Sequence, residues 1–164
     1  MTEIGSKLAA AREYLSAHPD EARYVDSVAT AKLEGGLRFR VEGPDGEAVT
    51  TDMPTSVGGS ASAPSPGWLF RAALSSCVGT LVAMRAAEEG VRLTSLEVAV
   101  ESESDDRGIL AIDSAVPSGP LSVLIQVRAV TGGPQVDRLI EEAARRCPVH
   151  DAIARAVPVR LEIG

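Results

Sequence analysis

The sequence predicts an α+β domain, and three observations support this class. Apolar and polar residues alternate with a period of two between about positions 24 and 52. An almost uninterrupted apolar helix is then expected at about 66–89, and further strands and a second helix follow it. We expect residues 1–19 to form a helical extension and residues 20–164 to form the domain itself.

The composition limits the classes of function. The 164 residues are enough for one domain with a real core. A net charge of -7 argues against binding to nucleic acid, which requires a basic face. The longest apolar run, Ala72–Met84, is too short to cross a bilayer, and the N-terminus does not resemble a signal peptide. We therefore expect a cytoplasmic protein with neither nucleic-acid nor membrane partners.

Three strands are expected early in the chain, joined by two turns. Period-two alternation begins at Tyr24, and Gly35-Gly36 then marks a hairpin turn into a second strand, Leu37–Val41. Pro44-Asp45-Gly46 is a second turn, because proline presets the bend and glycine accepts a positive φ. A third strand at about Ala48–Asp52 completes an antiparallel meander.

Two helices are predicted in the first half of the chain. Apolar residues recur at helical spacing over residues 3–17, and the proline that follows cannot continue that helix. Residues 56–65 form a loop of small residues, and such loops often hold functional groups. Ser65 followed by Pro66 is a favourable helix start, and the helix should stop at Gly90. Because it is apolar on most faces, we expect it to be central and buried.

The second half of the chain repeats strands and a helix. Strands are expected at Leu96–Ser102 and Leu121–Val130, with an acidic turn at Asp105–Gly108 between them. A helix then reaches Cys147, where the next residue, a proline, forces a break. Residues Val157–Ile163 alternate again and predict a closing strand.

The two cysteines, Cys77 and Cys147, are the first candidates for chemistry. They lie 70 residues apart, so only the fold could bring them together. From the residues alone, they are either a thiol redox pair or buried packing residues. A reactive thiolate needs a positive neighbour or a helix start, and Cys77 lies about three turns into its helix.

Arginines and a histidine could support such a thiol. Arg38 and Arg40 are two positions apart on one strand and project to the same face, where they could stabilise a thiolate or simply face solvent. His150 follows Cys147 by three positions, but this pair supplies only two metal ligands. A metal site is therefore not expected.

The segments around both cysteines resemble the OsmC/Ohr family of osmotically induced and organic hydroperoxide resistance proteins. Ser65–Cys77 is similar to the family's helix signature, in which Asn/Ser-Pro-Glu precedes a small-residue helix with the peroxidatic cysteine. Cys147–His150 resembles the second motif, usually Cys-Pro-hydrophobic-Ser, and Val157–Val159 resembles the terminal strand. The resemblance covers about residues 24–163.

This resemblance implies a fold and a reaction. The fold would be a set of antiparallel sheets wrapped around the long buried helix of an intertwined cytoplasmic homodimer, with active sites at the subunit interface. Cys77 would attack an organic hydroperoxide and become a sulfenic acid, and Cys147 would condense with it to a disulfide. A dithiol reductant, of lipoyl type in many members, would regenerate the thiols. No metal or organic cofactor is implied, and the enzyme would belong to the oxidative stress response.

Two departures from the family pattern bear on the site. The family glutamate that orients the catalytic arginine is replaced by Gly67, and Arg38 follows the Gly-Gly turn one residue late. Arg38 is the expected activating arginine and Arg40 the alternative, while His150 could assist either cysteine by proton transfer. Two other functions stay open: a non-enzymatic protein binding a small apolar ligand or a partner, and a redox sensor using the same cysteines.

Overall fold

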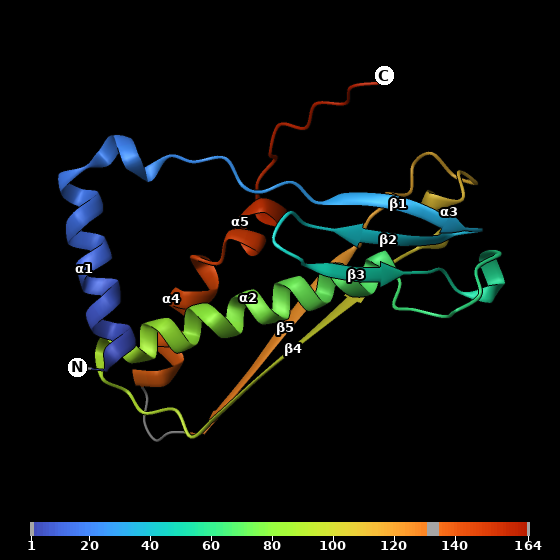
Figure 1. Ribbon diagram of the computed structural model, residues 1–164. Helices are drawn as coiled ribbons and strands as arrows, with labels where there is room; N and C mark the ends of the chain where they lie inside the picture. The colour runs from blue at the N-terminus through green and yellow to red at the C-terminus, as the bar shows by residue number, and fades with distance from the viewer. Residues whose placement is uncertain (1, 131–134, 164) are drawn as a thin grey trace. The chain divides into compact units, whose positions relative to one another are not determined.

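The computed structural model describes residues 2–130 and 135–163 (Figure 1). The chain divides into two units: a meander unit, Arg12–Phe70, and a core unit, Met1–Ala11 with Arg71–Gly164. The expected α+β class is confirmed, with two antiparallel sheets and a long helix.

The meander unit contains a three-stranded antiparallel sheet in the order β1 (Thr30–Gly35), β2 (Arg38–Glu42) and β3 (Ala48–Thr51). The two predicted turns are confirmed, since Gly36 has a φ of 57° and Gly46 a φ of 94°, values that glycine adopts without strain. Short 3-10 helices at Pro19–Ala22 and Thr55–Val57 flank the sheet along the chain.

The first strand is shorter than predicted. It begins at Thr30 and not at Tyr24, and residues 24–29 are exposed and outside the sheet. Thr30 pairs with Glu42, the last residue of β2, and the chain then enters the turn at Pro44. The neighbouring strand therefore has no residues left to pair with the earlier segment.

Helix α2 (Pro66–Glu89) has the predicted ends. The Ser65 hydroxyl accepts a hydrogen bond from the Trp68 backbone N–H at 3.2 Å, and Gly90, with a φ of 69°, follows the last turn. The helix begins in the meander unit and continues in the core unit from Arg71.

In the core unit, β4 (Ser95–Glu103) and β5 (Ser122–Val130) have nine residues each and pair antiparallel along their full length. The predicted acidic turn between them contains a short helix, α3 (Asp106–Ile109), whose N-terminus is capped by the Asp105 carboxylate. Helices α4 (Gln135–Arg145) and α5 (Pro148–Ala154) follow, with the predicted break at the proline.

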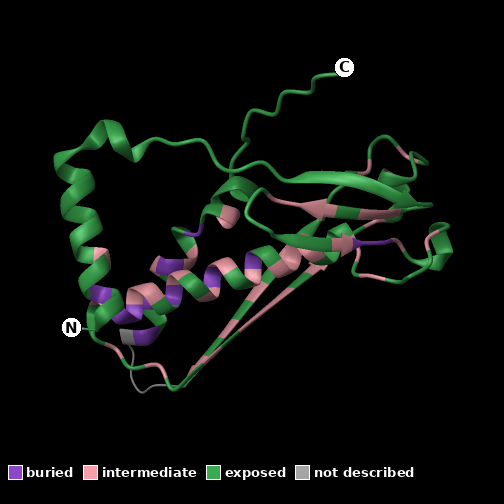
Figure 2. Cartoon of the chain, in the orientation of Figure 1, coloured by how far each residue is buried: buried purple, intermediate pink, exposed green. Residues whose placement is uncertain are grey.

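One stripe of α2 is buried against α4 and makes the core (Figure 2). The buried residues on α2 recur every four positions, as one helix face requires; the cluster is Leu74, Val78, Val82, Ala86, Leu139, Ala143 and Cys147. In the single chain the opposite flank is exposed, and consists of Ala73, Ser76, Thr80 and Ala83. Burial of α2 is therefore one-sided here, and not all round as its composition predicts.

Helix α2 is also long and apolar enough to cross a membrane by length and composition alone. Arg85 lies within it and pairs with Glu142 of α4 at 3.2 Å, while the buried stripe packs in the core. These contacts are those of a core helix.

Helix α1 (Glu3–Ala17) is confirmed, and its first turns are anchored to the end of α2. Gly5 is buried, and a Cβ there would lie 2.7 Å from the Ala87 carbonyl oxygen. The Thr2 hydroxyl donates to the same carbonyl at 3.2 Å. Only glycine permits this close approach.

The predicted closing strand is not formed in the single chain. Residues 157–163 lie outside any sheet, and Val159, Leu161 and Ile163 are 92%, 82% and 90% exposed. The alternation is present in the sequence, but a strand requires a partner for its backbone N–H and C=O groups. None of the described strands pairs with this segment.

Candidate functional site

The core unit brings Cys77 and Cys147 into contact. Cys77 lies in the middle of α2 on the edge of its buried stripe, and Cys147 directly precedes α5. Cys77 packs against the buried cluster that contains Cys147, the two side chains are close enough to interact, and both are free thiols. Cys77 is half-buried, whereas Cys147 is 0% exposed. A molecule from solvent therefore reaches Cys77 before Cys147.

The surroundings of Cys147 favour its protonated form. Burial raises the pKa of the Cys147 thiol, and the hydrogen bond and charge interaction with Cys77 raise that pKa further. The backbone amides of His150 and Val149 act in the opposite direction without offsetting burial. Cys147 is thus a thiol at neutral pH and can donate its S–H to Cys77.

His150 is held by the end of the preceding helix. Its Nδ1 lies 2.8 Å from the Ala144 carbonyl oxygen, which can only accept, so Nδ1 carries the proton. In the neutral ring Nε2 is then the proton acceptor. The side chain is half-buried, three residues after Cys147.

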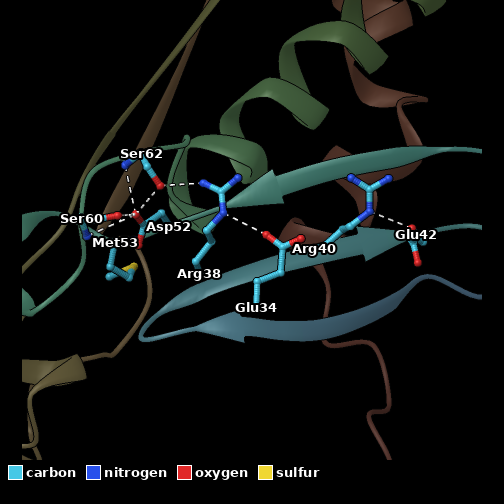
Figure 3. Close-up of polar contacts among 8 residues, drawn as sticks. All are labelled: Glu34, Arg38, Arg40, Glu42, Asp52, Met53, Ser60 and Ser62. Carbon is cyan, nitrogen blue, oxygen red and sulfur yellow. Dashed lines mark hydrogen bonds and ion pairs between the residues drawn. The ribbon is translucent and has the colours of Figure 1, made fainter.

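Arg38 lies in the meander unit at the start of β2, with two defined partners (Figure 3). Its Nε donates to Glu34 at 2.9 Å, and its Nη1 donates to the Ser62 hydroxyl at 2.6 Å. Within residues 2–130 and 135–163, Nη2 has no hydrogen-bond partner. The Arg38 side chain is 38% exposed.

Arg40 has a different partner. Its Nε donates to Glu42 at 2.8 Å on the same strand, and Lys32 lies 3.4 Å from the same carboxylate. The hydrogen bonds from Arg40 and Lys32 lower the pKa of Glu42. Arg40 is thus part of an exposed ion-pair cluster across β1 and β2.

A buried carboxylate in the meander unit was missed by the sequence analysis. Asp52, at the end of β3, is 2% exposed. It accepts hydrogen bonds from Ser60 and Ser62 in the small-residue loop, and these bonds hold the pKa of Asp52 well below its usual range (Figure 3). The detectable signal was an aspartate that ends a strand directly before a loop containing Ser-x-Ser.

The described residues contain no group of three or more His, Cys, Asp and Glu side chains that could hold a metal ion. The chemically distinctive arrangements are the contacting thiols of the core unit and the Asp52–Ser62–Arg38 chain of the meander unit.

Comparison with known proteins places the chain in a family. The family described as OsmC-like protein matches residues 59–162. No curated protein matches. Among solved structures, an OsmC-like protein of unknown function from Vibrio cholerae has a TM-score of 0.66 at 15% identity, over 79% of this chain and 94% of that one.

Two further solved structures carry names related to hydroperoxides. An organic hydroperoxide resistance protein OsmC from Legionella pneumophila has a TM-score of 0.62 at 22% identity, over 80% of this chain and 90% of that one. The organic hydroperoxide resistance protein OhrB of Bacillus subtilis has a TM-score of 0.56 at 23% identity, over 84% and 97%. At these identities the likeness establishes the fold, and the family match over more than half of the chain makes this protein a member of the OsmC-like family.

Proposed function

We propose that this protein is a cysteine-based peroxidase that reduces organic hydroperoxides. The contact between the Cys77 and Cys147 thiols is the observation that supports this most directly. Family membership adds support, as do structural relatives named for organic hydroperoxide resistance.

The half-buried and buried positions suit two different roles. The Cys77 thiolate attacks the terminal oxygen of the hydroperoxide, the O–O bond breaks, and the alkoxide takes up a proton and leaves as an alcohol. The resulting sulfenic acid reacts with the Cys147 thiol to give a disulfide and water. A dithiol of lipoyl type then reduces the disulfide and is itself oxidised to a cyclic disulfide.

Arg38 is our candidate for the residue that stabilises the Cys77 thiolate and the leaving oxygen. Two of its nitrogens are held, by Glu34 and by Ser62, whereas among the described residues Arg40 is held at Nε alone, by Glu42, so Arg40 stays the alternative. Arg38→Lys should lower kcat/KM more than Arg40→Lys. His150, with Nε2 available, is the candidate for moving a proton to or from either cysteine.

We also infer that the active form is an intertwined cytoplasmic homodimer. Two surfaces of the single chain support this: the exposed small-residue flank of α2 and the unpaired, alternating segment 157–163. In the same proposal, residues 1–19 are an extension and residues 20–164 form the domain. Light scattering on the full chain should give twice the mass of one chain, and a monomer would contradict the inference.

A single-turnover assay with cumene hydroperoxide tests the reaction. The two free thiols per chain should disappear, and mass spectrometry should find a Cys77–Cys147 disulfide. Cys77→Ser should show no reaction, while Cys147→Ser should stop at a sulfenic acid that dimedone traps. The peroxidase proposal fails if the thiol count is unchanged and Cys77→Ser behaves as the parent.

The same pair of thiols also fits a redox sensor, which is the second candidate. A sensor is oxidised once per chain without sustained turnover when dithiol is supplied. Steady-state consumption of hydroperoxide over many equivalents therefore separates the enzyme from the sensor. A third candidate, binding of a small apolar ligand, is consistent with an open hollow of about 310 Å³ in the meander unit, lined in part by Val28, Val41 and Val49.

A further inference from the structure

Arg38 needs an orienting partner that this chain does not have at the expected position. The family resemblance predicts a glutamate at position 67 that would hold this arginine. Position 67 is a glycine, so no carboxylate is present there. A free guanidinium on a long side chain has many rotamers, and a group that must meet a developing charge works best when it is held in place.

Asp52 is a fixed anchor within the same unit. Its Oδ1 accepts from the Met53 N–H at 2.8 Å. Its Oδ2 accepts from the N–H and hydroxyl of Ser60 at 3.2 and 2.5 Å, and from the N–H and hydroxyl of Ser62 at 3.0 and 2.8 Å. All five partners donate, so the carboxylate that they surround is ionised.

Ser62 connects this anchor to Arg38. A serine hydroxyl has one proton and two lone pairs, and Ser62 gives its proton to Asp52. The oxygen therefore presents a lone pair to Arg38 Nη1, which donates to it at 2.6 Å (Figure 3). Glu34 accepts from Nε at 2.9 Å. Two acceptors at separate nitrogens fix both the position and the plane of the guanidinium.

The loop is shaped so that both serines reach one carboxylate oxygen. Ala61, between them, has a φ of 52°, which is unusual for a residue with a side chain. Gly59 lies so close to Met53 that a Cβ would come within 1.9 Å of its carbonyl oxygen. Backbone strain of this kind is kept where the surrounding contacts over-determine it.

We propose that Ser62, anchored by Asp52, and Glu34 are positioning residues for Arg38 and replace the carboxylate that is absent at Gly67. Ser62 sets the Nη1 edge and Glu34 sets the Nε edge, while Nη2 has no hydrogen-bond partner among the described residues. The catalytic part of this role rests on the proposed peroxidase activity, whereas the positioning of Arg38 does not.

Ser62→Ala and Ser60→Ala form a matched pair of test variants. Each removes one hydroxyl hydrogen bond to Asp52 and keeps the backbone bond, but only Ser62 contacts Arg38. The first readout is the Arg38 Nε–Hε NMR signal of the full-length ¹⁵N-labelled protein, assigned by its loss in Arg38→Lys. The second readout is kcat/KM with cumene hydroperoxide.

Ser62→Ala should change the Nε–Hε signal and speed its hydrogen exchange, because Glu34 alone then holds the guanidinium, and should lower kcat/KM on the order of tenfold. Glu34→Gln should also move the signal. Ser60→Ala should leave the Nε–Hε signal in place and kcat/KM within about twofold of the parent. Ser62→Thr, which keeps a hydroxyl, should give the signal and the kcat/KM of the parent. In an Arg38→Lys background, Ser62→Ala should cause no further loss of kcat/KM.

Equal effects of Ser62→Ala and Ser60→Ala on the NMR signal would overturn the proposal, because both would then act only through the loop. If Ser62→Ala does not fold, Ser62→Thr against Ser62→Val supplies the same comparison at nearly constant volume. A parent protein that does not reduce hydroperoxides contradicts the proposed function alone, and the NMR comparison still decides the positioning role.

Discussion

The Cys147 thiol is fully buried and interacts with the thiol of Cys77, which is itself only half-buried. The contact joins the middle of α2 to the start of α5 inside the core unit. One sulfur is thus accessible while its neighbour is kept as a protonated thiol. This asymmetry suits the two roles that the proposed reaction gives to Cys77 and Cys147.

Alkylation should distinguish the two cysteines. We expect iodoacetamide to modify Cys77 first, and Cys147 only slowly and above the pH range of an ordinary thiol, because burial and Cys77 raise the pKa of Cys147. Peptide mass spectrometry against pH measures both rates. In Cys77→Ser, the pH midpoint for Cys147 should fall only partly, since burial stays. Equal rates for both cysteines at pH 7 would contradict this assignment.

Asp52 should make stability depend on pH at the acidic end. Its pKa is lower in the folded chain than the value of about 3.9 expected when unfolded, so its contribution is full above that value and declines as the pH falls below it. Urea unfolding should show Asp52→Asn clearly less stable than the parent at pH 7, with the gap narrowing below about pH 4. The exposed Asp26→Asn variant is the control, and a gap independent of pH would contradict the assignment.

Leu139 should be a major contributor to the core. It is 0% exposed and packs with the buried stripe of α2, so Leu139→Ala should lower the free energy of unfolding by about 2–5 kcal/mol. Ile112, which is 69% exposed, is the control, and Ile112→Ala should change stability by about 0.5 kcal/mol or less. Urea denaturation at one protein concentration measures both, because association would shift the midpoint.

Gly59 should be intolerant of a side chain. An added Cβ would overlap the Met53 carbonyl, so the backbone must move and the serines of the loop leave Asp52. We expect Gly59→Ala to cost about 1–3 kcal/mol of stability and to change the Arg38 Nε–Hε signal. At Gly119 nothing lies within 4 Å of the added atom, so Gly119→Ala is the control. Similar unfolding curves for the two variants would show that the loop rearranges freely.

The sequence predicted helix ends and turns correctly where they depend on a few neighbouring residues. The hydroxyl of Ser65 caps α2, Gly90 ends it, and the glycines at 36 and 46 make their turns, because each depends on a few neighbouring backbone groups. The alternating segment 157–163 has the same kind of signal but no strand in the single chain. A strand forms only when a neighbouring strand pairs with its backbone. The alternation of apolar and polar residues shows which face of a strand would be buried, but it does not provide that neighbouring strand.

The sequence by itself determined the α+β class, the turns, the ends of α2 and membership of the OsmC-like family. Only the tertiary structure decided that Cys77 contacts Cys147 across 70 residues, which face of α2 is buried, and that Ser62 joins Asp52 to Arg38. Such contacts form between residues far apart in the chain. These contacts depend on how helices and strands pack and on which groups hydrogen-bond to buried polar atoms. The local propensity of a residue for helix or strand determines neither of these.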